Sequence, residues 1–502
     1  MKNTARAAEL SISGTCLWSL HGGNMLEKVS QEAVRELDQI RRPSLKEKAK
    51  AAGKSLLGRG NALVSDVIFW PAGLLLTGLV EAGQTGEAEA YLAEWIRKGC
   101  AVQNPDDALT GSVLLTLYEE TGKDCYREAA GKVAAYLRGC IRDKEGSIVY
   151  GQRSGNRLIY ADGAGQTALF LARYARVSGK TAPGAAQSGS GSDASADQAD
   201  SGRRRAEARA ASGAAAAAGK TPAGAAAESG PGASSEEAAG GQSGGGSNAA
   251  ADQTDFGRQA SHTAAAAEQA SAGGQQVSYS AAEALEDARR QLVNYARYGM
   301  DARSGLPYHG YDLESGIKYG IIGWGRAIGW LLLGLSEYLC DAALYAAEET
   351  GFAEETGAAG ESAAFAVGRE EHLQVQELAQ GICRAVAERV RPDGMLSWQP
   401  DCLDGPLDSS ATGMIFYALL RMNRFRTAHP ELPAEVLAGI PQTDPALIDA
   451  AAAGLRSCIA EDGKVWYASA ECFDFSQYSQ QYGNYAWGQG SVLAFLSIYD
   501  LK

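Results

Sequence analysis

One long internal stretch of this chain lacks the side chains needed to form a hydrophobic core. Between Val177 and Val277 there is no Leu, Ile, Val, Met, Trp, Tyr or Cys, and Phe256 is the only aromatic residue. A segment without apolar side chains buries too little surface to offset the entropy that it loses on ordering. Residues 178–279 are therefore predicted to be a low-complexity insertion rich in Ala, Gly and Ser.

The rest of the chain, about 400 of the 502 residues, shows helical periodicity on both sides of this insertion. Because the pattern resumes unchanged, 1–502 is predicted to be a single domain, with a second, acidic insertion at 346–371. Capping residues and glycines divide the apolar runs. The expected helices lie near residues 27–40, 46–58, 65–82, 87–96, 106–118, 124–137, 162–175, 281–298, 323–344, 375–390, 409–422, 446–459 and 485–499.

Strand patterns are few, and only residues 147–150 and 464–467 are predicted to be strands. Helices that follow one another in pairs, with few strands between them, indicate an all-α fold. The arrangement that fits best is a six-hairpin (α/α)6 toroid, or barrel, in which six inner and six outer helices surround a funnel.

Composition excludes several classes of partner. A net charge of −14 disfavours nucleic acid, because an acidic chain repels polyphosphate. No window is expected to reach the ~20 apolar residues that span a bilayer, and the polar N-terminus lacks the apolar core of a signal peptide. Nine cysteines without a CxxC motif predict neither a disulfide framework nor a zinc ribbon. A cytoplasmic protein is therefore expected; the sequence leaves its oligomeric state open.

Five loop or helix-start segments carry residues that suit a carbohydrate. Arg326 and Trp330 lie four residues apart on one predicted helix face. Aromatic rings stack on the apolar faces of sugars, and arginine pairs with a carboxylate in a forked geometry. The segments are 160–166 (YADGAGQ), 305–312 (GLPYHGYD), 323–330 (GWGRAIGW), 407–414 (LDSSATGM) and 485–490 (YAWGQG).

In this order, the segments resemble those of the unsaturated rhamnogalacturonyl hydrolases of glycoside hydrolase family 105. That family is related to the unsaturated glucuronyl hydrolases of family 88. The resemblance covers most of the chain outside the two insertions. It implies the six-hairpin toroid and an acidic oligosaccharide substrate, left by a polysaccharide lyase, that ends in a 4,5-unsaturated uronic acid.

The resemblance also implies a mechanism. An aspartate protonates the double bond at C4 and activates the water that adds at C5; the hemiketal then opens and releases the neighbouring sugar. This chemistry needs a carboxyl group that both gives and takes a proton, and no metal or organic cofactor. The sequence contains no His, Cys and Asp cluster with the spacing of metal ligands.

The resemblance assigns Asp162 as the general acid and base, although a residue in its position is also a candidate helix N-cap. A second active-site aspartate is either Asp106 or Asp107, and the sequence does not decide between them. His309 is expected to contact substrate, with a structural hydrogen bond as the alternative.

Arg326 is expected to pair with the uronate carboxylate, or else to form a buried ion pair with a neighbouring helix. Trp324 and Trp330 are candidates for stacking on a sugar, but the core of a toroid also needs aromatic residues.

Two other functions stay open. Another α/α-toroid carbohydrate enzyme is one, either an epimerase, which would use two or more site histidines, or an inverting glycosidase, which needs a pair of separated carboxylates. The other is a catalytically silent relative that binds sugar.

Overall fold

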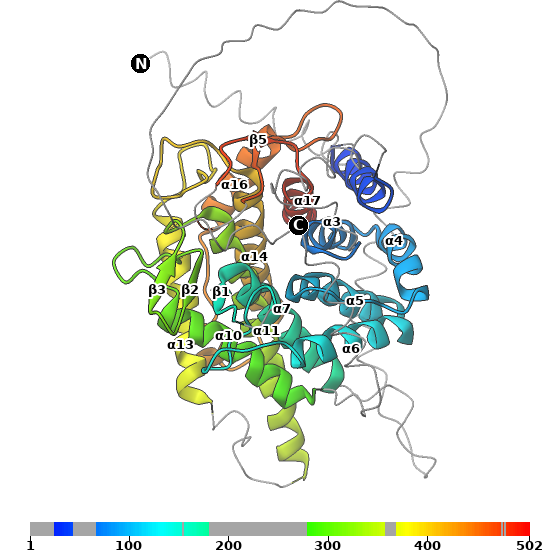
Figure 1. Cartoon of the computed structure of the whole chain (residues 1–502), viewed down its shortest axis with the longest axis vertical. Coiled ribbons are helices and arrows are strands. Elements are labelled where there is room, and N and C mark those ends of the chain that lie inside the picture. Colours follow the sequence, from blue (N-terminus) through cyan, green and yellow to red (C-terminus); the bar gives the residue numbers. More distant parts are fainter. Residues whose placement is uncertain are drawn as a thin grey trace, which may run out of the picture. The chain divides into compact units, whose positions relative to one another are not determined.

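A closed ring of six helices forms the centre of the fold. The computed structural model describes residues 25–43, 67–152, 155–179, 279–356, 368–472, 475 and 478–501, which lie in one compact unit. Within them, the ring helices are α3 (Trp70–Glu81), α5 (Ala108–Thr121), α7 (Ala161–Gly179), α11 (Gly325–Thr356), α14 (Ser409–Ala428) and α17 (Ala486–Asp500). Each packs on the next in this order, and α17 packs on α3, which closes the ring (Figure 1).

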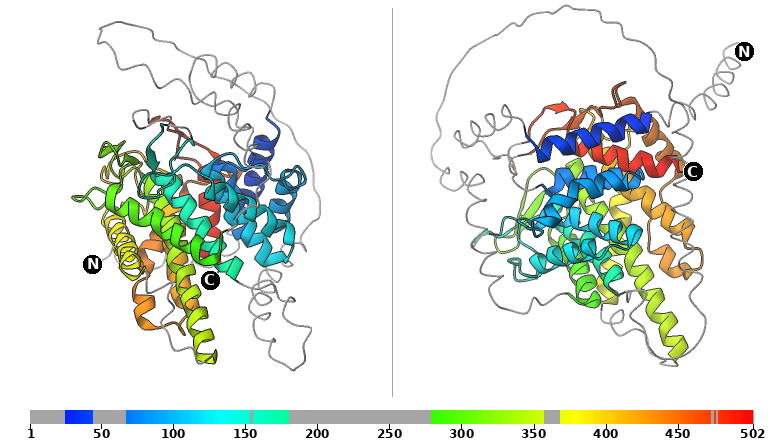
Figure 2. Two further views of the ribbon diagram at one scale, coloured as in Figure 1. Left: turned by 60° about the horizontal axis from the view of Figure 1, so that its bottom comes forward. Right: turned by 90° about the vertical axis from the view of Figure 1, so that its right-hand side faces the viewer.

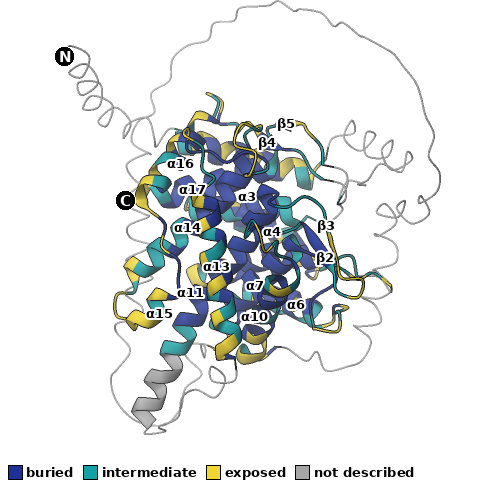
Figure 3. Cartoon of the chain, turned by 90° about the vertical axis from the view of Figure 1, so that its left-hand side faces the viewer, coloured by how far each residue is buried: buried dark blue, intermediate teal, exposed yellow. Residues whose placement is uncertain are grey.

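A second set of helices covers the outside of this ring. These helices bury one face and expose the other, whereas the ring helices are mostly buried along their length (Figure 3). The helix over residues 25–41 lies beside α17 (Figure 2), where the Gln489 side chain donates to the Val29 carbonyl at 3.0 Å. The other outer helices are α4 (Thr85–Arg97), α6 (Asp124–Arg138), α10 (Ala281–Tyr298), α13 (Arg369–Ala387) and α16 (Pro445–Ser457). The predicted six-hairpin toroid is therefore confirmed.

Helices α7 and α11 approach each other closely because both carry a glycine at the crossing. A Cβ atom added at Gly165 would lie 2.2 Å from the carbonyl oxygen of Trp330, and one added at Gly334 would lie 2.5 Å from the Gly165 oxygen. Neither contact is possible for a real side chain. The glycines thus fix α7, which carries Asp162, against α11, which carries Arg326.

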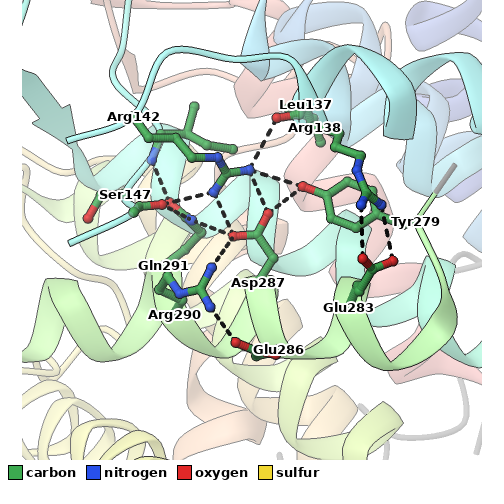
Figure 4. A network of polar contacts seen from close by, with 12 residues as sticks. Leu137, Arg138, Arg142, Ser147, Tyr279, Glu283, Glu286, Asp287, Arg290 and Gln291 are labelled. Atoms are coloured by element: carbon green, nitrogen blue, oxygen red, sulfur yellow. Dashed lines mark hydrogen bonds and ion pairs between the residues drawn. The ribbon is translucent and has the colours of Figure 1, made fainter. Parts of the chain in front are cut away.

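The chain on both sides of the long insertion is joined in space, although residues 180–278 lie outside the described part. A Cβ at Gly179, the last residue of α7, would lie 3.7 Å from the Cβ of Ala281, the first of α10. Asp287 of α10 accepts two hydrogen bonds of 2.7 Å from Arg142, which follows α6, and also bonds to the hydroxyl of Tyr279 (Figure 4). The helical hairpin therefore closes across the insertion.

Short strands position the segments that precede the ring helices. Strands β1 (Leu158–Tyr160), β2 (Gly310–Asp312) and β3 (Ile317–Tyr319) form an antiparallel sheet in that order. Tyr160 pairs with Gly310, and Ala161 N–H donates to the carbonyl of His309 at 3.0 Å. The start of α7 is thereby held next to His309. A smaller pair joins β4 (Ala468–Ser469) to β5 (Tyr482–Gly483).

The two strands predicted at 147–150 and 464–467 are wrong. Each segment makes an isolated bridge, Arg142 to Ile148 and Ile459 to Val465, and does not continue as a ladder. Tight turns precede both segments, with Gly146 at φ 87° and Gly463 at φ 89°. The chain turns back too sharply there for a longer strand pair to form.

Helix α11 continues to Thr356, beyond its predicted end at 344, and α13 begins at Arg369, before its predicted start at 375; the insertion at 346–371 stays a prediction. Residues 357–367 lie outside the described part, as does the helix expected at 46–58. The expectation of no window long and apolar enough to span a membrane is also wrong. By length and composition alone, the segment Gly325–Ala347 is long and apolar enough to cross a membrane. Its mean hydropathy is 1.4, but its apolar window is 94% buried inside the protein. Its apolarity is that of an inner ring helix.

Candidate active site

The predicted site residues gather where the ring helices begin. Trp70, at the start of α3, packs on Trp487 of α17 and on Trp330 of α11, with ring centroids 5.0 and 6.0 Å apart. Gln166 of α7 donates to Asp106, which precedes α5, at 3.1 Å. Ser469 of β4 hydrogen-bonds both to Asp408, the N-cap of α14, and to Arg326 at the start of α11. The outer helices return the chain to the same end before each ring helix, so segments far apart in sequence meet at one end of the ring.

Asp162 and His309 form the centre of this end. Asp162 lies in the first turn of α7, and its Oδ2 is 3.8 Å from His309 Nε2. The Asp162 side chain is 21% exposed, whereas that of His309 is 1% exposed. Asp162 Oδ1 and His309 Nε2 are buried and have no hydrogen-bond partner among the described residues. Two polar groups thus face each other, and each has an atom without a hydrogen-bond partner in the described part of the protein.

The two neighbouring aspartates have different surroundings. Asp106 accepts hydrogen bonds from Gln166 at Oδ1 and from the Tyr150 hydroxyl at Oδ2, the latter at 2.9 Å. Asp107 Oδ2 accepts from the backbone N–H groups of Gln103 and Asn104 at 2.8 and 3.1 Å. The geometry therefore separates an aspartate that faces α7 from one that caps the short helix η1 (Pro105–Asp107).

Tyr150 connects Asp106 to the surroundings of Asp162. Burial, and next the charge of Asp106, raises the pKa of Tyr150 well above its ordinary value. The phenol therefore keeps its proton and acts as a donor to the carboxylate. Asp162 also contributes to this shift, and a Cβ added at Gly163 would contact the Tyr150 ring at 3.6 Å.

Arg326 is buried and bound by protein acceptors. Its Nη1 donates to the carbonyl and hydroxyl of Ser469 at 2.6 and 2.8 Å, and Nη2 donates to the carbonyl of Ala470 at 3.0 Å. The guanidinium lies 4.7 Å from the Trp324 ring and 5.2 Å from the Trp487 ring. These contacts differ from the ion pair expected as its structural alternative, and its pairing with a substrate carboxylate stays a prediction.

Asp408 extends this network. It caps α14 through Ser410 and Ala411 and accepts from the Ser469 hydroxyl at 2.6 Å. Ser469 therefore links the N-cap of α14 to Arg326. Trp324 and Trp330 are both 2% exposed. Their burial fits the core role, and stacking on a sugar stays a prediction.

The opposite half of the ring is filled by charged pairs around a small cavity. Glu337 of α11 accepts from Arg173 of α7 at 2.5 Å and from Arg421 of α14 at 2.7 Å. All three line a cavity to which each ring helix contributes. Because these charges neutralise one another, the cavity offers no reactive group comparable to Asp162.

Three polar residues of the site were missed from the sequence. Tyr150 lies in a segment predicted to be a strand, Gln166 lies inside the recognised motif without an assigned role, and Tyr478 lies in a loop without periodicity. Only Gln166 could have been identified, since it is four residues after Asp162 and so lies on the same helix face.

Comparison with known proteins defines the class. Residues 276–499 match the family model described as Glycosyl Hydrolase Family 88. The match confirms the resemblance predicted from the motifs, and the chain is a glycoside hydrolase. No curated protein matches the chain in sequence.

Solved structures share the fold at low sequence identity. A possible member of family 105 from Klebsiella pneumoniae has a TM-score of 0.51 and 16% identity, over 86% of this chain and 81% of that one. A similar protein from Salmonella enterica has a TM-score of 0.50 and 14% identity, over 86% and 82%. An unsaturated glucuronyl hydrolase specific for heparin has a TM-score of 0.50 and 13% identity, over 95% and 97%.

Proposed function

We propose that this chain hydrolyses oligosaccharides that end in a 4,5-unsaturated uronic acid and releases that sugar. The observation that carries the proposal is the carboxyl group of Asp162, which is partly open to solvent and has one buried oxygen without a hydrogen-bond partner among the residues that the structure describes. A group that gives a proton to a substrate and then takes one from water needs an oxygen that is not already engaged in a hydrogen bond with the protein. The family match supports the same class of reaction.

In the proposed reaction, the protonated Asp162 gives its proton to C4 of the unsaturated ring. Water adds at C5 and returns a proton to the carboxylate, so that one molecule of water is added across the double bond. The hemiketal at C5 opens to a ketone and leaves a hemiacetal at C1. That hemiacetal collapses to an aldehyde, and the glycosidic oxygen takes up the hydroxyl proton and leaves with the neighbouring sugar. Asp106, bound by Gln166 and Tyr150, supplies a second carboxyl group at the same end of the ring.

The direction of the ring helices supports an anionic substrate. Their first turns meet at this end, and a helix N-terminus carries a partial positive charge of about half an elementary charge. Several such ends stabilise the uronate carboxylate beside the acidic side chains of the site.

The test follows the absorbance of the unsaturated uronate on a panel of disaccharides made by polysaccharide lyases. The proposal expects loss of the absorbance with at least one of them, and a loss at least a hundredfold slower in Asp162→Asn. The matching saturated disaccharides are the control substrates. Cleavage of saturated disaccharides alone would indicate an ordinary glycosidase, and binding without turnover would indicate a silent sugar-binding relative; either result overturns the proposal.

A further inference from the structure

A tyrosine from the C-terminal part of the chain holds the ring of His309. The hydroxyl oxygen of Tyr478 is 2.8 Å from His309 Nδ1, and it accepts a hydrogen bond from the backbone N–H of Ile321 at 3.2 Å. Tyr478 is placed by its bridge to Cys472, between β4 and β5. One hydroxyl group thus joins this segment, the start of β2 and the connection from β3 to α11.

The packing leaves these two side chains little freedom. Gly320 has a φ of 80°, and a Cβ there would lie 2.5 Å from the Tyr478 hydroxyl and 2.7 Å from the His309 Cβ. The Tyr478 ring also packs edge-on against Trp324 and Trp398, with centroids 5.5 and 5.6 Å away. The packing therefore holds the partly buried 2.8 Å contact in place.

The direction of this hydrogen bond decides which nitrogen of a neutral His309 carries the proton. The 2.8 Å contact allows either direction: the Tyr478 hydroxyl can accept from Nδ1–H, or it can donate its own proton to Nδ1. Donation in that direction puts the imidazole proton on Nε2, which faces Asp162 at 3.8 Å. The reverse direction would place the Nε2 lone pair opposite a carboxylate oxygen, which is repulsive when Asp162 is ionised.

We propose that Tyr478 is a positioning residue that donates to Nδ1 of neutral His309 and thereby keeps the Nε2 proton directed at Asp162. Asp162 becomes negatively charged when it gives up its proton, and a hydrogen bond from Nε2–H stabilises that charged form. The distance of 3.8 Å is that of the free site, and such contacts tighten in a substrate complex. The catalytic part of this inference rests on the proposed function, whereas the position of the proton does not.

The first experiment determines which ring nitrogen of His309 carries the proton, and it needs no substrate. In uniformly 15N-labelled full-length protein, the ring nitrogens of His309 are assigned by comparison with His309→Gln. The expected result in the wild type at neutral pH is a protonated Nε2 and a pyridine-like Nδ1 that is shifted by its hydrogen bond. A protonated Nδ1 in the wild type would overturn the proposal, whatever the substrate is.

The second experiment compares Tyr478→Phe with Tyr482→Phe. Tyr482 lies in the same part of the chain, but its hydroxyl bonds to the exposed side chain of Gln480 at 3.0 Å. Tyr478→Phe should remove the hydrogen-bond shift of Nδ1 and lower kcat about tenfold with little change in KM, since one hydrogen bond contributes about that factor. Tyr482→Phe should change neither the Nδ1 signal of His309 nor kcat.

Unchanged His309 nitrogen signals in a folded Tyr478→Phe would refute the positioning role. If the wild type shows the expected proton but turns over no unsaturated uronide, the proposed function fails while the tautomer inference stands.

Discussion

Removing residues 182–274 should stabilise the protein rather than damage it. The deletion leaves eight residues, 180–181 and 275–280, between the end of α7 and the start of α10. A Cβ at Gly179 would lie only 3.7 Å from that of Ala281, so eight residues can join the two helix ends without strain. The composition of the deleted segment predicts no packed core that would be lost.

The size of the effect follows from loop closure. The entropic cost of closing a flexible loop grows by about 0.6 kcal/mol for each doubling of its length. Shortening the connection from about 100 residues to eight removes between three and four doublings. The free energy of unfolding should therefore rise by about 2 kcal/mol.

Chemical denaturation of the full chain and of the deletion variant measures this difference. The expected result is a higher midpoint with a similar slope, because folding of the toroid buries the same surface in both. A second variant with a 30-residue Gly/Ser linker in place of the deleted segment should fall between the two. A loss of several kcal/mol, or a broader transition, would instead show that the segment packs on the toroid and contributes to its stability.

Four further substitutions test individual residues. Burial, and next the charge of Glu32, raises the pKa of Glu36 to about 7 in the folded protein. The free energy of unfolding therefore falls as the pH rises from the unfolded-state pKa of this carboxyl group through 7. Relative to wild type, Glu36→Gln should gain about 2.5 kcal/mol in unfolding free energy between pH 5 and pH 9. Arg326→Ala should lower the unfolding free energy by about 3 kcal/mol in denaturant titrations, because it removes the donor to the Ala470 carbonyl, one of two donors to the Ser469 carbonyl, and the cation between two tryptophan rings; unchanged stability with a raised KM would instead favour uronate pairing. Asp106→Asn should lower the rate on unsaturated uronides at least a hundredfold, whereas Asp107→Asn, which can still cap through its amide oxygen, should retain most of the activity.

The ring could be predicted because its helices are defined by local patterns. The helix predicted at 281–298 is found at Ala281–Tyr298, where Ser280 and Glu283 form a capping box. The end of α11 was missed for a physical reason. Residues 346–356 are rich in Ala and Glu, which favour a helix as readily as they favour an exposed insertion, and Gly351 does not stop the helix.

The site could be predicted only in part. Asp106 and Asp107 are adjacent, and both precede a helix, so the sequence contains nothing that separates them. Their difference arises from Tyr150, which lies 44 residues further along the chain, and from Gln103 next to the helix start. Tyr478 reaches His309 across 169 residues from a segment without periodicity. Such contacts depend on how the ring closes, which no local pattern encodes.

The close contact between α7 and α11 gives a way to test whether the ring itself sets the geometry of the site. Gly334→Ala adds a methyl group that would lie 2.5 Å from the Gly165 oxygen, which is backbone and must move. Because Asp162 lies one turn from Gly165, we expect a shift of the Asp162 carboxyl relative to His309.

Gly381→Ala in α13 is the matched control, since its Cβ would meet no atom of the described residues within 4 Å, and alanine should stabilise that helix by up to about 1 kcal/mol. Thermal melts and initial rates on an unsaturated disaccharide should show loss of both stability and activity in Gly334→Ala and neither loss in Gly381→Ala. If Gly334→Ala is destabilised but keeps the wild-type rate, α7 and α11 can separate without disturbing the proton-transfer groups. The position of Asp162 would then be set by the β1–β2 pairing at the start of α7 rather than by the ring.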